Sequence, residues 1–215
     1  MKAIFVALLL CICVPASAAS LSPMAQALPA STSTGAVQVI NDSKIERRYQ
    51  IVVDAMSVGV NGEKVKTPAT DLRFYPTPIM TLGPGKTQTL RWKRSAPDTS
   101  REQLYWIQLV PLDDGEVIQF SNGTSLKVKL GIQVPWAFTP KGMTSQLAAR
   151  HEGDFLVFTN TGNAAASLSQ VRYGTNSDLG VQLVLPGERL RLKVKTQSNQ
   201  VQFFQGGALH TLPVE

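Results

Sequence analysis

Apolar and polar side chains alternate without interruption from residue 126 to residue 134, in the sequence LKVKLGIQV. Successive side chains of a β-strand point to opposite faces, so this segment is expected to form a strand with one apolar face and one polar face. Taken alone, the alternation favours an ordinary half-buried strand whose apolar face points into the protein's own core. The apolar row consists of Leu126, Val128, Leu130, Ile132 and Val134.

Residue types that carry covalent or metal chemistry are scarce and scattered. The sequence has no G-x-S-x-G, Walker, H-E-x-x-H or C-x-x-C motif. The two histidines, His151 and His210, lie far apart in sequence, which argues against a two-histidine metal site. Asp113 and Asp114 fall at a predicted turn, where aspartate is favoured by backbone geometry. We therefore expect no catalytic residue, no metal ion, no cofactor and no enzymatic activity.

Positive charge exceeds negative charge, with 21 Lys and Arg against 15 Asp and Glu and a formal net charge of +6. The basic residues are spread along the chain, mostly at alternate positions of predicted strands, as a solvated face requires. An exported protein rarely meets nucleic acid, so we expect no nucleic-acid partner. Four basic residues share one face of a single predicted strand, namely Arg189, Arg191, Lys193 and Lys195.

The first eighteen residues are typical of a secretory signal peptide. Lys2 precedes an apolar run over residues 3–14, and residues 16–18 (ASA) form a processing site of the A-x-A type. The apolar run is too short to span a bilayer, so we expect cleavage after Ala18 and export. Both cysteines of the chain lie in this segment. The mature chain would then have no disulfide and would depend on an ordinary core.

Short strands must position all of these residues. Helical periodicity is nearly absent, and alternating or apolar runs are separated by turns of Gly, Pro, Asn and Asp at the spacing of a β-sandwich. The lead over residues 21–35 is small and polar, which predicts a weak edge strand or poor order. No internal repeat is evident. We predict an all-β protein that is divided into residues 1–18 as signal peptide, 19–140 as N-terminal domain, 141–153 as interdomain linker and 154–215 as C-terminal domain.

Two neighbouring segments resemble a known family. Residues 77–92 read TPIMTLGPGKTQTLRW and residues 100–111 read SREQLYWIQLVP. Together they resemble the N-terminal domain of the periplasmic pilus-assembly chaperones of the chaperone/usher pathway. The similarity extends over residues 37–214 and is to the alternate group of that family, because residues 137–140 (AFTP) stand where the ordinary group has Tyr-Arg-Pro. The matching positions are Pro78, Leu82, Pro84, Gly85, Arg91, Arg101, Glu102, Tyr105, Trp106, Ile107 and Pro111.

The resemblance implies two immunoglobulin-like β-sandwich domains in an L-shaped arrangement, and a chaperone that is not an enzyme. In that family the chaperone lends a strand to a pilin subunit that lacks its own last strand, and alternate apolar side chains fill the groove of the subunit. Burial of four aliphatic side chains at about 1.5–3 kcal/mol each favours such a complex before the costs of association. By position, the donor residues are Leu126, Val128, Leu130 and Ile132.

The resemblance also implies that basic residues in the cleft between the domains bind the C-terminal carboxylate of the subunit. Lys129 is the first choice and Lys127 the second, while Arg47 and Arg48 are the nearest cations to the first strand and can equally be a solvated strand start. The implied partners are fimbrial subunits and an outer-membrane usher, in the periplasm and without stable membrane insertion. An uncovered donor strand leaves self-association of the free protein open.

A second hypothesis, from a different class of protein, is an exported adhesin or carbohydrate-binding β-sandwich. Its ligand platform would be formed by Trp92, Trp106 and Trp136. Against it, Trp106 lies inside a predicted core strand, and the other two lie at strand ends, where partial burial is common.

Overall fold

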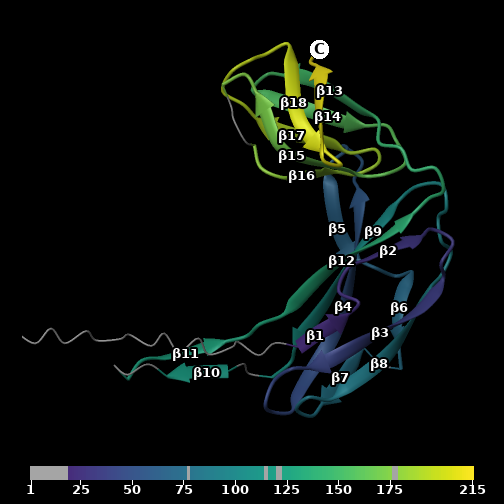
Figure 1. Cartoon of the computed structure of the whole chain (residues 1–215), viewed down its shortest axis with the longest axis vertical. Helices are drawn as coiled ribbons and strands as arrows, with labels where there is room; N and C mark the ends of the chain where they lie inside the picture. The colour runs from purple at the N-terminus through teal and green to yellow at the C-terminus, as the bar shows by residue number, and fades with distance from the viewer. Residues whose placement is uncertain (1–18, 77, 114–115, 120–122, 176–178) are drawn as a thin grey trace, which may run out of the picture.

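The structure is a computed structural model of the 215-residue chain, and it describes residues 19–215 except 77, 114–115, 120–122 and 176–178. The expected signal peptide, residues 1–18, lies outside the described residues. The described chain forms nineteen β-strands and no α-helix, and so has no helical segment able to span a bilayer. Two β-sandwiches meet at an angle and form an L (Figure 1). The predicted all-β, two-sandwich fold is confirmed.

The N-terminal sandwich is built from two sheets. Its strands are β1 (Ala19–Ser22), β2 (Gln26–Pro29), β3 (Thr34–Asn41), β4 (Arg47–Val58), β5 (Lys64–Pro68), β6 (Leu72–Tyr75), β7 (Ile79–Leu82), β8 (Thr87–Arg94), β9 (Gln103–Pro111) and β12 (Ile132–Thr139). The first sheet has the order β1-β3-β8-β6. The second sheet has the order β2-β12-β9-β4-β5, and β7 also pairs with β4. Of these pairings only that of β2 with β12 is parallel.

Residues 19–29 form two edge strands rather than one. β1 closes the first sheet beside β3, and β2 closes the second sheet beside β12. The switch between sheets follows Ser22, at Pro23, which has no N–H to donate to a strand ladder. Leu21 is buried in the core, and the Trp136 indole N–H donates to the Met24 carbonyl at 3.3 Å. These contacts hold the lead in place.

One core lies between the two sheets and is rich in aromatic rings. Trp136 is fully buried, with its ring centroid 5.6 Å from Trp92 and 5.7 Å from Phe74. Phe138 contacts Trp92 at 5.6 Å. Because Trp92 and Trp136 are buried together, they cannot form the exposed sugar platform of the second hypothesis; Trp106 is half-buried, on the opposite face of β9 from the core residues.

A buried asparagine holds the Pro-Gly turn of this sandwich. The Asn41 amide group donates to the Leu82 carbonyl at 2.8 Å. The backbone of Asn41 exchanges bonds with the turn, since Gly85 donates to its carbonyl at 2.8 Å and its own N–H donates to Lys86 at 3.0 Å. Gly85 has a φ of +63°, which favours glycine. The Leu82, Pro84 and Gly85 of the sequence motif therefore have a structural role.

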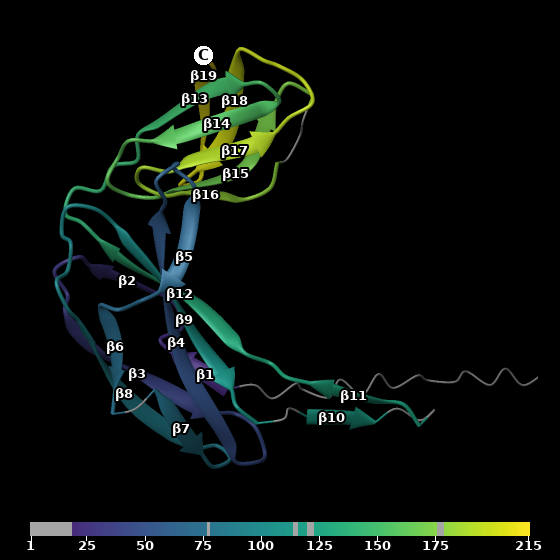
Figure 2. The same ribbon diagram turned by 180° about the vertical axis from the view of Figure 1, so that it is seen from behind.

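A two-stranded arm extends from the second sheet. β10 (Glu116–Gln119) and β11 (Ser125–Val128) form an antiparallel pair that has no further strand partner among the described residues. The arm lies in the chain between β9 and β12, which are neighbours in the second sheet. Figures 1 and 2 show it projecting away from both sandwiches.

The C-terminal sandwich is also built from two sheets. Its strands are β13 (Leu147–Glu152), β14 (Phe155–Asn160), β15 (Ala166–Tyr173), β16 (Gln182–Val184), β17 (Arg189–Lys193), β18 (Gln200–Gln205) and β19 (Ala208–Pro213). The third sheet has the order β13-β14-β17, and the fourth has the order β16-β15-β18-β19. A separate core lies between them.

The predicted linker over residues 141–153 needs correction, because β13 occupies its second half and pairs with β14 along its whole length. The sequence of β13, LAARHE, has one fully buried side chain, Ala149, which is small. An alternation of small and polar residues gives a weak strand signal. The strand-free connection between the domains is residues 140–146.

Because each sandwich has its own core, we expect damage to one core to destabilise one domain. Trp136→Ala removes a fully buried indole and should lower the free energy of unfolding of the N-terminal domain by about 3–5 kcal/mol. The remaining tryptophans, Trp92 and Trp106, both lie in that domain, so their fluorescence during denaturation follows it alone. Phe203→Ala, in the C-terminal core, is the matched control and should leave the fluorescence transition nearly unchanged. Equal shifts in both variants would show that the domains unfold as one unit.

Candidate functional site

The apolar row predicted from the sequence leaves the core and runs out onto the arm. Val134 is buried in the N-terminal core, and Ile132 is half-buried against it. Further out, Leu130 and Leu126 expose 49% and 51% of their surface. The side chain of Val128 lies outside the described part of the structure, although its backbone belongs to β11. The predicted single strand is two, since β11 ends at Val128 and β12 begins at Ile132, and the apolar row along them is covered at one end and open to solvent at the other.

The arm also has open strand edges. Within the described residues β10 and β11 have only each other as strand partners, so each keeps one edge along which a further strand could pair. A two-stranded hairpin is at best marginally stable by itself in water. Leu126 on this hairpin and Leu130 just beyond it expose apolar surface of the kind that is characteristic of contact sites.

The cations predicted to anchor a carboxylate fall in two places. Lys127 and Lys129 are exposed on the arm, between the leucines in sequence. Arg48 lies at the start of β4, where its N–H donates to the Asp113 carboxylate at 2.7 Å and its carbonyl accepts from Leu112 at 2.8 Å. These contacts place Arg48, with Arg47 beside it, at the base of the arm.

The structure does not place these four cations in the cleft between the domains. β4 is twelve residues long, and its far end and the loop after it face the C-terminal domain. At 3.3 Å per residue, Arg47 and Arg48 are roughly 36 Å from that end.

The loop after β4 and the following strand, β5, make one side of the domain junction. Gly62 accepts a hydrogen bond from the Arg189 N–H at 2.7 Å. The Lys64 ammonium donates to the Leu183 carbonyl and lies 3.5 Å from the carboxylate of Glu188. Glu188 is almost fully buried, so this ion pair is well shielded from solvent on the acidic side.

Glu102 makes the other side of the domain junction. Its backbone N–H donates to the Asn163 carbonyl at 2.7 Å, and its carboxylate accepts from the Ala165 N–H at 2.6 Å. Burial raises the pKa of Glu102, and the bond from Ala165 acts in the opposite direction with a smaller effect. The sequence predicted Glu102 only as a motif residue, whereas the structure shows that it joins the two domains.

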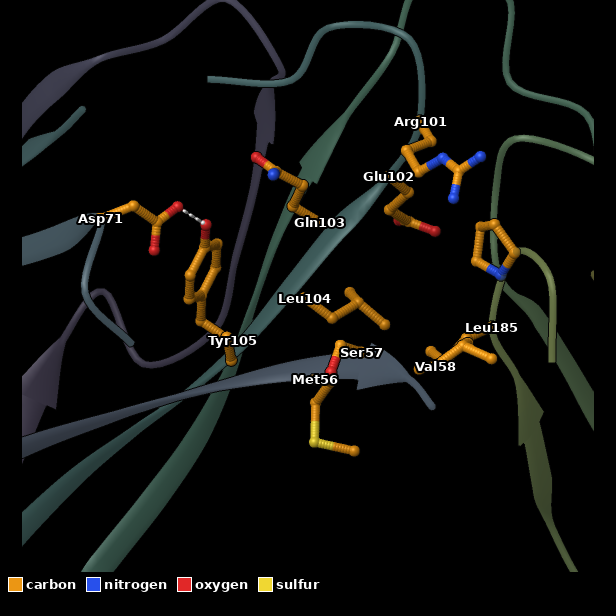
Figure 3. Close-up of a pocket in the computed structure, with 12 residues that line it drawn as sticks. Met56, Ser57, Val58, Asp71, Arg101, Glu102, Gln103, Leu104, Tyr105 and Leu185 are labelled. Carbon is orange, nitrogen blue, oxygen red and sulfur yellow. Dashed lines mark hydrogen bonds between the residues drawn. The ribbon is translucent and has the colours of Figure 1, made fainter. Parts of the chain in front are cut away.

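Two cavities at the junction share one cation. The first has a volume of about 310 Å³ and the second about 400 Å³, and Arg101 lines both. Figure 3 shows Arg101 and Glu102 side by side on one wall of the first cavity. Two carboxylates of that cavity already accept hydrogen bonds, because Asp71 accepts the Tyr105 hydroxyl and Glu102 accepts the Ala165 N–H. A guanidinium in such a place can bind an incoming carboxylate through two parallel hydrogen bonds.

Sequence reasoning did not place Arg101 at the domain junction. The signal was present, since Arg101 belongs to the Arg-Glu pair that precedes β9. The sequence could not show that the C-terminal domain lies next to Arg101. Three residues of that domain line the second cavity, namely Thr161, Gly162 and Asn163. Among the described residues no group of His, Cys, Asp and Glu could hold a metal ion.

The family model for pili and flagellar-assembly chaperones, PapD N-terminal domain, matches residues 20–144. That is more than half of the chain, and the chain belongs to this family of chaperones. The resemblance seen in the sequence is confirmed, and the family consists of chaperones rather than enzymes. No curated protein sequence matches the chain.

Solved structures with the same fold include three chaperone systems. A chain of the CsuC–CsuE chaperone–tip adhesion subunit pre-assembly complex, from the archaic chaperone-usher Csu pili of Acinetobacter baumannii, is 15% identical, with 92% of this chain and 98% of that chain covered and a TM-score of 0.69. A chain of the complex of the SafA pilin with the SafB chaperone of Salmonella enterica is 19% identical, with 91% of this chain and 95% of that chain covered and a TM-score of 0.60. The class 5 fimbriae chaperone CfaA is 14% identical, with 91% of this chain and 99% of that chain covered and a TM-score of 0.58. At these identities the similarity is one of fold.

The raised pKa of Glu102 makes the stability of the junction depend on pH. A carboxyl group whose pKa is raised by folding contributes stability that is present below its ordinary pKa and is lost as the pH rises through the raised value. Glu102→Gln cannot ionise and keeps an acceptor for Ala165. We therefore expect the variant to gain thermal stability relative to the parent as the pH rises from below the ordinary range of glutamate to neutral. Melting curves of both proteins across that range measure the difference, and a constant difference at all pH values would contradict it.

Proposed function

We propose that this protein is a periplasmic chaperone that captures fimbrial subunits by donor-strand complementation and delivers them to an outer-membrane usher. The observation that carries the proposal is the apolar row that continues from the core onto the arm and is exposed at Leu126 and Leu130. Family membership supports the chaperone function. Export to the periplasm is supported by the signal peptide expected at residues 1–18.

Capture would proceed by strand addition. An open edge of the arm pairs through main-chain hydrogen bonds with a subunit that lacks one strand, and the apolar row enters the groove that the missing strand leaves. We assign Leu126, Val128, Leu130 and Ile132 to that groove. Each leucine that passes from half-exposed to buried contributes on the order of 1 kcal/mol, and the main-chain ladder fixes the register.

The partners of related structures support this choice of substrate. Two structures with the same fold are complexes of a chaperone, one with a tip adhesion subunit and one with a pilin. We propose that the partner of this chain is likewise a fimbrial subunit. The competing adhesin hypothesis has lost its sugar platform, because Trp92 and Trp136 are buried in the core.

A carboxylate anchor is the second part of the proposed site. We assign it to Arg101, because this residue lines both junction cavities and lies close to the end of β12, where Gln103 pairs with Phe138. A subunit strand that runs along the arm toward the junction would bring its C-terminal carboxylate to this guanidinium. Lys129, and after it Lys127, remain the alternatives on the arm, and Arg47 and Arg48 are those at its base.

A charge on the apolar row should prevent capture. Leu126→Glu and Leu130→Glu each place a carboxylate where the groove is apolar, and we expect subunit affinity to fall by about 100-fold or more because the charge must be buried without a partner. The measurement is co-purification from the periplasm with the cognate fimbrial subunit, followed by titration of the purified pair.

Ser125→Glu is the matched control, since it adds the same charge to an exposed position of β11 that alternation places on the other face. Folding is unaffected in all three variants if the leucines are exposed as described. Normal capture by both leucine variants would remove the arm from the binding site, and unfolding of the N-terminal domain would show that the row is core.

Loss of the anchor should weaken capture without affecting folding. Arg101→Ala removes a charge-assisted bidentate pair, and we expect roughly 10- to 100-fold weaker subunit binding. Lys129→Ala tests the alternative on the arm, and Arg73→Ala, an exposed cation on β6, is the control for net charge. A loss in Lys129→Ala without one in Arg101→Ala would place the anchor on the arm. Unchanged subunit binding in both variants would show that neither Arg101 nor Lys129 is the anchor.

A further inference from the structure

The outer face of the first sheet carries positive charge and no negative charge. Its four strands, β1, β3, β8 and β6, contain no Asp or Glu, and residues 19–41 have no charged side chain. Three exposed cations alternate with buried core residues along β6 and β8, so they point outward. We call this surface the basic patch and define it as Arg73, Arg91 and Lys93 together with the exposed ring of Tyr75.

The four side chains of the basic patch form a compact block. β6 and β8 are antiparallel neighbours, with Arg73 directly opposite Lys93 and Tyr75 directly opposite Arg91. Directly opposed side chains have Cβ atoms about 5 Å apart, and alternate residues of one strand are about 7 Å apart. The three cations therefore occupy three corners of a small rectangle, and the tyrosine occupies the fourth.

No carboxylate of the described chain neutralises these cations. Within the described residues none of the three takes part in an ion pair. The two acids beside this end of the sheet have other partners, since Asp71 accepts the Tyr105 hydroxyl and Asp98 accepts the Ser100 N–H at 2.8 Å. The positive charge of the basic patch is therefore available to a ligand.

The opposition of Arg73 and Lys93 has a cost in stability. Like charges directly opposite each other on neighbouring strands are destabilising. The cations of β17 differ in this respect, because Arg189 pairs with Glu152 at 2.9 Å. An anion that binds between Arg73 and Lys93 replaces their repulsion with attraction, so its binding should stabilise the N-terminal domain.

We infer that the basic patch binds an acidic, extended segment of a second protein. Alternate side chains of an extended chain are about 7 Å apart, which is the spacing of Arg91 and Lys93 on β8. Carboxylates at such positions match the planar fork of donors of arginine. Tyr75, which is 47% exposed, adds a hydroxyl group and an apolar ring to the same surface.

An anionic membrane or a small anion fits the patch less well. Each cation close to an anionic bilayer strengthens binding by about five-fold, so three give about 100-fold, and stable attachment needs a second signal such as an acyl chain. Small ligands bind in concave sites, whereas the patch lies on an exposed sheet face. An extended polypeptide can lie along both strands and meet all three cations.

The position of the patch leaves the arm free. In Figures 1 and 2, β6 and β8 lie on one side of the N-terminal sandwich, and the arm projects from the other side. A ligand on the arm and an acidic segment on the patch can therefore be bound at the same time. The inference does not depend on what the arm binds.

Titration with synthetic peptides tests the inference. The isotope-labelled mature protein is titrated with a blocked peptide in which Asp and Ser alternate, and backbone amide shifts are followed by NMR, which measures weak binding and locates it. We expect shifts centred on residues 73, 75, 91 and 93 that disappear at high salt. A peptide with the same number of Asp residues, each separated by three Ser residues, should bind more weakly because its carboxylates are too far apart for neighbouring cations.

Arg91→Gln with Lys93→Gln should weaken binding of the alternating peptide by about 10-fold, because it removes two exposed ion pairs. The matched control is Lys193→Gln with Lys195→Gln, which removes the same charge at the same separation from exposed positions of the C-terminal domain. The control should change the affinity by less than about two-fold.

Lys93→Glu separates a binding role from a structural one. The new carboxylate faces Arg73, so the variant should melt at a higher temperature than the parent and should no longer bind the peptide. A lower melting temperature would contradict the repulsion on which the inference rests. Equal losses in the patch and control variants, equal affinities for the two peptides, or no shifts at the patch would overturn the inference. So would binding of anionic vesicles or inorganic phosphate in place of the peptide, which would identify a different ligand.

Discussion

The N-terminal sandwich covers one apolar row over only part of its length. Phe138, Trp136 and Val134 fill the core between the two sheets, whereas Leu130 and Leu126 continue the same row beyond it. No element of the described chain extends far enough to cover them, because the first sheet ends with the sandwich and the arm is two strands wide. Apolar surface exposed in this way is unfavourable in water, and its burial against another molecule would be favourable.

Each sandwich has a similar polar contact around a buried asparagine. In the N-terminal domain, Asn41 spans 41 residues to reach the Leu82 carbonyl beside a Pro-Gly turn. In the C-terminal domain, Asn160 spans 24 residues to reach Val184, and Gly187 donates to its carbonyl at 2.7 Å. Each asparagine is fully buried with its polar groups paired, which is the condition under which a buried amide stabilises a fold.

Local patterns were enough to predict the fold class, but not every strand and not what each strand meets. Alternation from Leu126 to Val134 predicted a single strand, whereas the structure has two, β11 and β12, with residues 129–131 outside both. The point at which the apolar row leaves the core depends on how far the facing sheet extends. β13 was missed because its inward residue, Ala149, is small. Arg101 and Glu102 were recognised as a motif without their part in the domain junction, because that part is defined by residues more than sixty positions later, such as Ala165. In each case the missing information was the position of a distant element.

The arm and the domain junction are the two ends of a single ladder. β9 and β12 pair without a break from Leu109 and Ile132, at the base of the arm, to Gln103 and Phe138, beside Glu102. The seven pairs of this ladder span about 20 Å, and an antiparallel ladder in the middle of a sheet cannot lengthen or bend easily. The ladder therefore fixes the distance that a ligand strand must span if it lies along the arm and reaches the junction. Because Glu102 also holds the C-terminal domain, the position of that domain is set by the same ladder that presents the apolar row.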